Sequence, residues 1–188
     1  MKKLFTFNMV TLDGFFEGQN GDIDWHNVDE EFNDFAVQQL HDIGTLVFGR
    51  VTYAGMASFW PTPFALENDP MVAGLMNSIP KIAASRTLQA TDWNNTRLVS
   101  ANVSEELNKL KSQPGKDIAI FGSANLIASL VSSGVIDEHR IMINPVLIGH
   151  GTPLFQDVNH TIKLKLRKTR TFGNGNVLLY YGKGDESI

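Results

Sequence analysis

Three predicted strands of this chain end in short turns whose residues could bind phosphate. The turns are Gly49-Arg50 with Thr52, Ser85-Arg86, and Gly122-Ser123. A helix that starts directly after a strand presents unpaired N–H groups and the positive end of its dipole. Glycine lets a ligand approach the backbone, and Arg, Ser and Thr side chains donate hydrogen bonds to phosphate oxygens. These turns therefore predict a site for an anionic ligand.

Each turn taken alone has an equally good structural interpretation. Gly-Ser turns between strands and helices are common, and a single arginine is more often a solvated surface cation. Ser123 could cap the helix that follows it, and Thr52 could donate at the start of its own helix. Arg50 and Arg86 together favour a ligand with more than one phosphate, such as a dinucleotide with an extra ribose phosphate. This pattern favours NADPH over NADH.

Three carboxylates are candidates for a proton donor, and the sequence does not select among Asp13, Asp24 and Glu30. Asp13 lies in a predicted turn, where it could orient a ligand or cap the turn itself. Glu30 lies in the first turn of a predicted helix, where an acid stabilises the helix dipole. His26 is a further conceivable donor, because an unperturbed imidazole titrates near neutral pH.

Aromatic residues lie in two predicted loops that could enclose a flat ligand. Trp25 belongs to the predicted loop 15–27, and Trp60 stands at a corner followed by two prolines. An aromatic loop residue can cover a heterocycle, or it can fill the edge of the hydrophobic core. The sequence leaves both interpretations open for Trp25.

Composition excludes several classes of function. The chain has 188 residues and a formal charge of −4, which predicts one domain over residues 1–188 and argues against nucleic acid as a partner. It has no cysteine, and its five histidines show no metal-ligand spacing, so we expect no metal site. We expect no membrane span and no signal peptide, and hence a cytoplasmic protein.

The elements that position these turns alternate between strands and helices. Apolar runs predict strands at residues 4–10, 45–48, 81–84, 96–99, 118–121 and 138–147. Helical spacing predicts helices at 29–43, from 50 to about 58, at 103–111 with Ser104 as N-cap, and between Ser123 and Gly134; residues 64–78 are expected to be a loop plus a short helix. A final hairpin pairs 162–172 with 177–182 around Gly173-Asn174-Gly175-Asn176. This order predicts an α/β fold with a mostly parallel sheet, an antiparallel edge and helices on both faces.

Familiar nucleotide-binding and hydrolase motifs are missing from the sequence. No G-x-G-x-x-G opens a helix after a strand, and no Walker A or G-x-S-x-G sequence occurs. The predicted nucleotide site is therefore not of the Rossmann, P-loop or α/β-hydrolase type.

Motifs along nearly the whole chain resemble the RibD C-terminal-domain family. They are Thr11-Leu12-Asp13-Gly14, Gly49-Arg50-Val51-Thr52-Tyr53, Trp60-Pro61, Ser85-Arg86-Thr87-Leu88, Gly122-Ser123-Ala124-Asn125-Leu126, Val135-Ile136-Asp137-Glu138 and Asn144-Pro145-Val146 through Leu154-Phe155. The resemblance implies a dihydrofolate-reductase-like three-layer fold and a homodimer. It also implies NADPH bound at the Gly49-Arg50 turn and at the Gly122-Ser123 turn with Ala124 and Asn125, and hydride transfer to a heterocycle.

Two phenylalanines depart from the riboflavin-pathway members of that family. Phe15 and Phe121 stand where the riboflavin pattern has Lys and Glu. We therefore expect a stand-alone member in which Phe15, Trp25, Trp60 and Phe121 line a more apolar substrate pocket. The leading hypothesis is an NADPH-dependent reductase of a small planar heterocycle or conjugated carbonyl. The alternatives are 5-amino-6-(5-phosphoribosylamino)uracil reductase of riboflavin biosynthesis and a non-catalytic nucleotide-binding or sensor protein.

Overall fold

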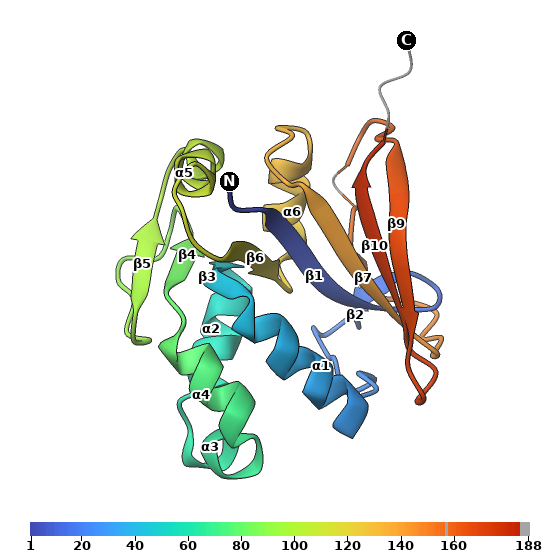
Figure 1. Ribbon diagram of the computed structural model, residues 1–188. Coiled ribbons are helices and arrows are strands. Elements are labelled where there is room, and N and C mark those ends of the chain that lie inside the picture. Colours follow the sequence, from blue (N-terminus) through green and yellow to red (C-terminus); the bar gives the residue numbers. More distant parts are fainter. Residues whose placement is uncertain (157, 185–188) are drawn as a thin grey trace.

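An eight-stranded mixed sheet forms the centre of the molecule. The computed structural model describes residues 1–156 and 158–184 (Figure 1). The strand order is β5-β4-β3-β6-β1-β7-β10-β9, and β10 pairs antiparallel with both β7 and β9 while the other pairs are parallel. The strands are β1 (Leu4–Thr11), β3 (Ile43–Gly49), β4 (Lys81–Ala84), β5 (Thr96–Val99), β6 (Asp117–Phe121), β7 (Glu138–Asn144), β9 (Leu164–Thr171) and β10 (Val177–Lys183). The predicted α/β fold, with its antiparallel C-terminal hairpin, is confirmed.

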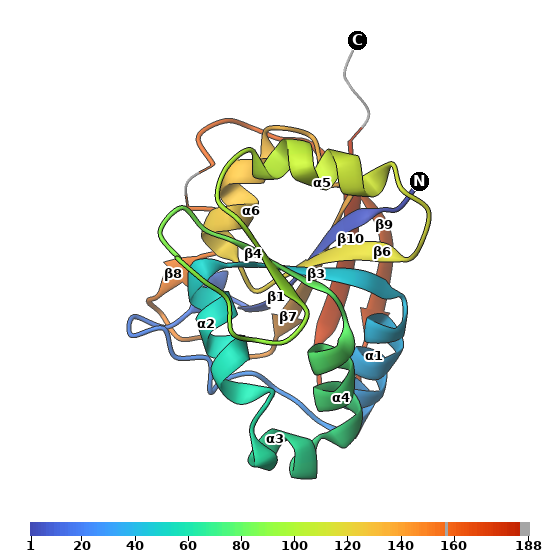
Figure 2. The ribbon, with the colours of Figure 1, turned by 90° about the vertical axis from the view of Figure 1, so that its left-hand side faces the viewer.

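Helices cover both faces of this sheet. Figure 2 shows α5 and α6 on one face, and α1, α2 and α4 on the other with α3 beyond them. The helices are α1 (Glu30–His41), α2 (Arg50–Phe59), α3 (Pro63–Asn68), α4 (Pro70–Ser78), α5 (Val103–Lys111) and α6 (Ala124–Val131). Among the described residues, no helix is long and apolar enough to cross a membrane.

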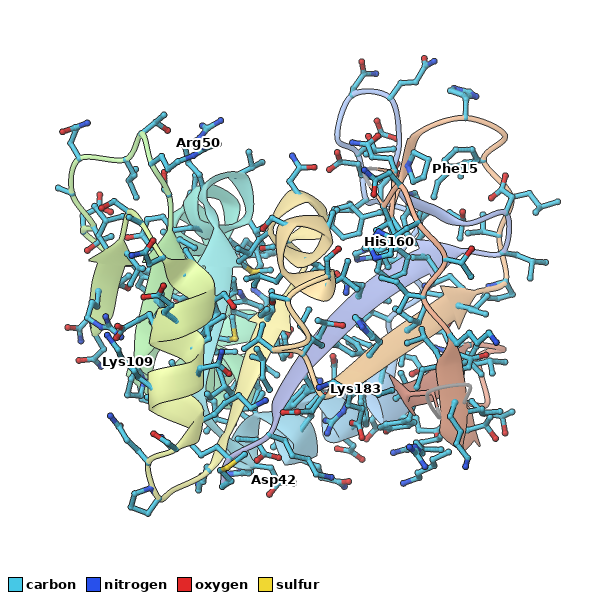
Figure 3. The ribbon with its side chains drawn as sticks, turned by 90° about the horizontal axis from the view of Figure 1, so that it is seen from above. Phe15, Asp42, Arg50, Lys109, His160 and Lys183 are labelled. Carbon is cyan, nitrogen blue, oxygen red and sulfur yellow. The ribbon has the colours of Figure 1, made fainter. Side chains whose placement is uncertain are left out.

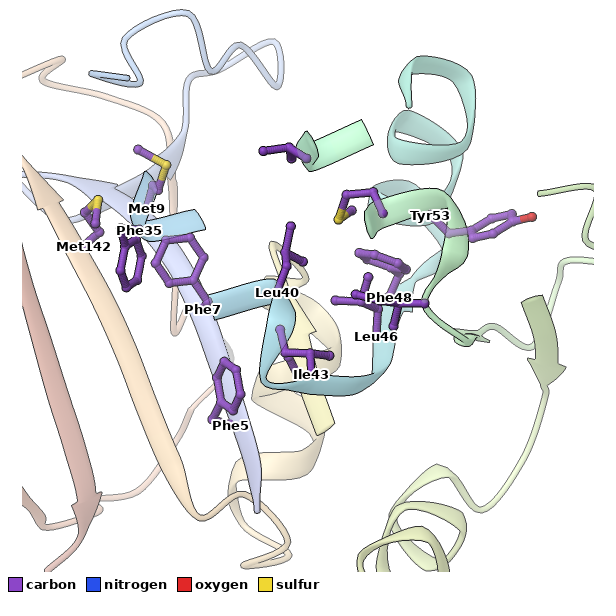
Figure 4. Close-up of a cluster of buried hydrophobic side chains, with 14 of the residues drawn as sticks. Phe5, Phe7, Met9, Phe35, Leu40, Ile43, Leu46, Phe48, Tyr53 and Met142 are labelled. Atoms are coloured by element: carbon purple, nitrogen blue, oxygen red, sulfur yellow. The ribbon is translucent and has the colours of Figure 1, made fainter. Parts of the chain in front are cut away.

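The first strand lies between two layers of core, so all eight of its residues are buried. Because successive side chains of a strand point to opposite faces, Phe5, Phe7 and Met9 pack toward α1. Leu4 packs toward α6 on the other face. Figure 4 shows the larger cluster, in which Phe35 of α1 lies close to Phe7.

One half of the α6 face has no helix over it. Seen from above in Figure 3, α5 and α6 lie over the half of the sheet that contains β5, β4, β3 and β6, and no described helix lies over β7, β10 and β9. Part of β7 is covered by the β2–β8 segments, because Phe16 and Leu154 pack with Ile141 and Ile143. The side chains of Ile141, Ile143, Leu179 and Tyr181 are half-buried there, and Leu166 is 49% exposed.

Several predicted boundaries were wrong. The first helix ends at His41 rather than at residue 43, because Ile43 already pairs with Asp117 as the first residue of β3. The predicted strand 138–147 ends at Asn144, whose side chain bonds the backbone of Val10. The loop 15–27 contains β2 (Phe15–Glu17), which pairs with β8 (Thr152–Pro153) to form a small second sheet.

Two helix predictions also need correction. Residues 64–78 form two helices, α3 and α4, and each has a proline in its first turn, where a missing N–H costs no hydrogen bond. The N-cap of α5 is Asn102 in the left-handed conformation, so Ser104 lies inside the helix rather than capping it.

Candidate functional site

The Gly49-Arg50 and Gly122-Ser123 turns are in direct contact at the carboxyl edge of the sheet. The backbone N–H of Gly49 donates to Oγ of Ser123 over 2.9 Å, and the hydroxyl of Thr52 donates to the carbonyl of Gly122. Register explains this proximity, because β3 and β6 are neighbouring parallel strands that end together. The amino ends of α2 and α6 are therefore adjacent.

Neither of these helix starts is neutralised by an acidic residue or a side-chain cap of its own. The first turns of α2 and α6 contain no acidic residue, and neither N-cap, Gly49 or Ser123, makes a side-chain capping bond. By contrast, α1 and α5 carry glutamates in their first turns. The paired starts thus keep unpaired N–H groups and uncompensated positive dipole ends, which suits a phosphate ligand.

The third predicted turn lies beside the first. Ala84, the last residue of β4, is in register with Gly49, so Ser85-Arg86 follows at the next strand end. Arg50 and Arg86 are both exposed, and in the described part of the chain neither has an ion-pair partner. Two exposed arginines beside two helix starts fit a ligand with several phosphate charges, as NADPH has.

The hydroxyl groups of Ser123 and Ser85 make hydrogen bonds other than the predicted ones. The Ser123 hydroxyl donates to the carbonyl of Phe121 over 2.9 Å and accepts from Gly49, and its residue is only 4% exposed. It neither caps α6 nor has a proton left for a ligand. Oγ of Ser85 accepts from the backbone N–H groups of Thr87 and Leu88. The backbone N–H groups, including those near Ala124 and Asn125, are the donors that remain at the α6 turn.

Gly122 is required by the geometry of its turn. Its φ of +54° lies in the left-handed region, and a Cβ there would lie 3.3 Å from Cγ2 of Thr52. It would also lie 4.0 Å from Cζ of Phe16, so the β2 segment lies close to the turn. A larger residue would strain the backbone and push α2 away from α6.

An aromatic cluster lies beside the turns on the α1 face of the sheet. The ring centroids of Phe7 and Phe121 are 5.5 Å apart, and those of Phe7 and Phe35 are 5.9 Å apart. Trp25 and Trp60 pack against the same cluster. Three of the four predicted pocket residues, Trp25, Trp60 and Phe121, thus border the large core cluster of the α1 face. Phe15 is not part of this cluster, because it pairs with Pro153 in the small β2–β8 sheet.

The candidate acids are not gathered at this cluster. Asp13, Asp24 and Glu30 are all exposed. Asp13 accepts from the backbone N–H groups of Ile148 and Gly149, and bonds from the Thr11 hydroxyl and from these N–H groups lower the pKa of its carboxyl. Burial lowers the pKa of His26 to about 4, so its imidazole is neutral at neutral pH and has no extra proton to donate.

Two groups of hydrogen-bonded polar residues were not predicted from the sequence. Glu31, next to Glu30, accepts from the backbone N–H of Gly173 and from Arg170, and these bonds lower the pKa of its carboxyl. Asn27 and Asn144 belong to a set of hydrogen-bonded asparagines from three distant segments. The sequence indicated a turn at 173–176, but it contained no signal for the partners of that turn.

Other depressions in the surface lie away from the turns. Cavities of about 570 Å³ and 470 Å³ share Asp92, Trp93 and Asn94 in their linings, and the larger one reaches the amino ends of β4 and β5. Among the described residues, no group of three or more histidines or carboxylates is placed to hold a metal ion. The chemistry-bearing residues therefore concentrate at the carboxyl edge of the sheet.

Comparisons with known proteins agree with this architecture. Residues 2–178 match the family model described as the RibD C-terminal domain. The protein YyaP of Bacillus subtilis (strain 168) is 40% identical over 174 residues, which cover 92% of this chain and 90% of YyaP.

Solved structures share the fold at low sequence identity. A Shewanella sp. PV-4 protein described as a riboflavin biosynthesis protein superposes with a TM-score of 0.74 at 22% identity, covering 97% of this chain and 99% of that one. Dihydrofolate reductase from Enterococcus faecalis, complexed with NADP(H), superposes with a TM-score of 0.64 at 16% identity, covering 97% of each chain. The predicted dihydrofolate-reductase-like fold is confirmed.

Proposed function

Because this chain belongs to the RibD C-terminal-domain family, we propose that it is an NADPH-dependent reductase of a small planar heterocycle or conjugated carbonyl. The observation that carries the proposal is the bond between Gly49 and Ser123, which holds two uncapped, acid-free helix starts together. Arg50 and Arg86 stand exposed beside them.

The chain's own residues supply binding and orientation in this proposal. The backbone N–H groups at the starts of α2 and α6 hold the linking phosphates, and Arg50 and Arg86 favour an additional ribose phosphate. NADPH, when bound, supplies a hydride. The aromatic cluster with Trp25, Trp60 and Phe121 excludes water and offers flat surfaces to a planar substrate.

The proposed substrate is more apolar than a ribose phosphate. The side chain of Phe121 contacts Phe7 in the core cluster and offers neither charge nor hydrogen bonds. A pocket wall of this kind cannot replace the polar contacts that a phosphoribosyl group needs. The riboflavin-pathway reductase is therefore the second candidate, and it would need its phosphate contacts from other residues.

A ligand titration followed by an activity screen tests the proposal. NADPH should raise the thermal midpoint more than NADH at equal concentration, because only NADPH carries the extra phosphate. NADPH absorbance should then fall with a member of a panel of pterins, aminouracils and quinones. Oxidation only with the phosphoribosylamino-uracil would favour the riboflavin-pathway reductase instead. Binding without oxidation by any compound would favour a non-catalytic sensor, and no stabilisation by either nucleotide would contradict the cofactor site.

We further propose that the chain forms a homodimer through the part of the sheet that no helix covers. Half-buried Leu179 and Tyr181 and exposed Leu166 supply the apolar surface for this contact. An apolar sheet face is stabilised when a second layer excludes water from it. A second copy offers the same face in return, as a two-fold interface requires.

A further inference from the structure

Asn27 is hydrogen-bonded to three other asparagines from distant parts of the chain. Its N–H donates to Oδ1 of Asn144 over 2.9 Å, and its side-chain Nδ2 donates to the carbonyl of Asn174 over 2.8 Å. Its carbonyl accepts from Nδ2 of Asn174 over 3.1 Å and from Nδ2 of Asn176 over 2.8 Å. We call Asn27, Asn144, Asn174 and Asn176 the asparagine clasp.

The clasp is anchored in the interior of the protein. Asn144 and Asn176 are both 0% exposed. Nδ2 of Asn144 donates to the carbonyl of Val10 over 3.2 Å, which ties the clasp to the carboxyl half of β1. Buried amides that lose their partners are costly, so this arrangement is expected to be rigid. The clasp therefore fixes Asn27 to the central strands β1 and β7.

The same hairpin turn also holds the start of α1. Glu31 accepts from the backbone N–H of Gly173 over 2.8 Å and from Arg170 over 3.1 Å. Asn27 lies three positions before Glu30, the first residue of α1, so the turn is hydrogen-bonded to this region at two points. Trp25, directly before this region, packs against the core cluster.

The tip of the loop before Trp25 lacks such anchors. Residues 19–24 are all exposed, and the backbone N–H groups of Gly18, Asn20 and Gly21 donate to acceptors within the loop. For example, the N–H of Gly18 donates to the carbonyl of Asp22, and the N–H of Gly21 donates to the carbonyl of Gly18. Local bonds among exposed residues open at low free-energy cost.

We propose that Asn144 and Asn176 are positioning residues of the reductase. Through the backbone of Asn27 they hold Trp25 and the start of α1 as a fixed wall of the substrate pocket. This inference rests on the proposed function, since it assigns the wall to that pocket.

Nuclear magnetic resonance of the full chain tests the proposal without requiring turnover. The indole N–H of Trp25 is buried and has no hydrogen-bond partner among the described residues, so its signal should respond to small shifts of its surroundings. Asn176→Ala should move or broaden this signal and speed amide exchange at Asn27 about tenfold, as expected for the loss of about one hydrogen bond. The indole signals of Trp60 and Trp93 should stay in place. Asn108→Ala, an exposed position on α5, is the matched control.

Two further measurements separate positioning from general stabilisation. The NADPH dissociation constant of Asn176→Ala should stay within about twofold of wild type, because the phosphate turns lie on β3, β4 and β6. With an active substrate, kcat should fall while the KM for NADPH stays constant. If Asn176→Ala does not fold, Asn174→Ala, which is half-buried, should show the same pattern more weakly.

The outcomes are distinguishable from those of the proposed function. An unchanged Trp25 signal, or equal changes in all three indole signals, would overturn the positioning role. A wild-type protein that does not bind NADPH would overturn the proposed function, while a selective response of Trp25 would still establish the clasp as the anchor of this segment.

Discussion

Arg50 and Ser123 show how residues of one site take different roles. Arg50 is exposed at the start of α2 and has no ion-pair partner in the described chain, so its charge is available to a ligand. Ser123 lies buried between two strand ends, and its hydroxyl joins the backbones of Gly49 and Phe121. In the proposed function, Arg50 therefore controls affinity for the ligand, and Ser123 controls the spacing between the helix starts.

Replacing Arg50 should separate the two nicotinamide cofactors. A charge-assisted hydrogen bond contributes about 1.5–3 kcal/mol, so Arg50→Ala should weaken NADPH binding about 10- to 100-fold. NADH binding should change much less, because NADH lacks the extra phosphate. Fluorescence titration with both nucleotides measures this difference. Arg97→Ala is the control, since Arg97 pairs with Glu106 and lies at the start of β5. Equal losses for NADPH and NADH would remove Arg50 from the phosphate site.

Buried His139 should make stability depend on pH. Burial lowers its pKa to about 4, from 6.5 in an unperturbed histidine, and its Nδ1 lies 3.2 Å from the Thr6 hydroxyl. Between these values the unfolded chain binds a proton that the folded chain does not, so stability falls as pH falls from 6.5 toward 4. Above pH 6.5 this contribution is constant. The loss should reach at most about 3 kcal/mol, at about 1.4 kcal/mol per pKa unit.

Urea unfolding of His139→Gln at a series of pH values measures this contribution. The fall in stability between pH 6.5 and 4 should be smaller in this variant than in wild type. Exposed His150, replaced by Gln, serves as control and should leave the slope unchanged. Parallel curves for His139→Gln and wild type would mean that His139 protonates equally in both states.

At the scale of elements, α2 and α6 act as one unit at the carboxyl edge of the sheet. The β3–α2 and β6–α6 connections meet because their strands are neighbours, although 74 positions separate Gly49 from Ser123. Thr52 and Gly122 add a second link between them. A substitution that shifts the backbone of one turn should therefore also shift the other turn.

Two glycine substitutions test that coupling. Gly122→Ala places a side chain at a φ of +54° and 3.3 Å from Thr52, so we expect a loss of about 1–2 kcal/mol and weaker NADPH binding. Gly55→Ala inside α2 meets nothing within 4 Å, and it should stabilise the protein by about 0.5–1 kcal/mol with unchanged binding. Thermal unfolding and nucleotide titration of both variants measure these effects. Normal NADPH affinity in a destabilised Gly122→Ala would place the phosphates elsewhere.

At the scale of the whole molecule, the two faces of the sheet are unequally covered. Helices α1, α2 and α4 cover the α1 face, but over β7, β10 and β9 the α6 face carries no described helix (Figure 3). The apolar side chains of this half are left partly in contact with water within a single copy. A second copy that covers them would raise stability without any change in the fold.

Light scattering after size exclusion tests the dimer. Wild type should elute at twice the mass of one chain, and Leu166→Glu should shift the equilibrium toward monomer because it buries a charge in the contact. Leu12→Glu, which changes another exposed leucine on the β1–β2 turn, should leave the mass unchanged. A wild-type monomer at micromolar concentration would contradict this proposal.

Local patterns in the sequence were enough to predict an α/β sheet with an antiparallel edge and the positions of the three turns, whereas the dihydrofolate-reductase-like fold came from the family resemblance. Buried strands read as continuous apolar runs, and glycines at strand ends mark where the chain leaves the sheet. The asparagine clasp could not be predicted in this way. Its members come from a loop, the end of β7 and the β9–β10 turn, and nothing in a local pattern of residues specifies which distant side chain an amide will meet.

The sequence by itself determined that strands alternate with helices and that Gly49, Ser85 and Gly122 follow strands. The periodicity of apolar residues and the conformational freedom of glycine are local properties, so they can be recognised from the sequence alone. Only the tertiary structure decided that these turns adjoin, that the Ser123 hydroxyl is used between them, and that Phe15 pairs with Pro153 in the small sheet. Strand order and register set those distances, and both depend on how the whole sheet packs its two faces.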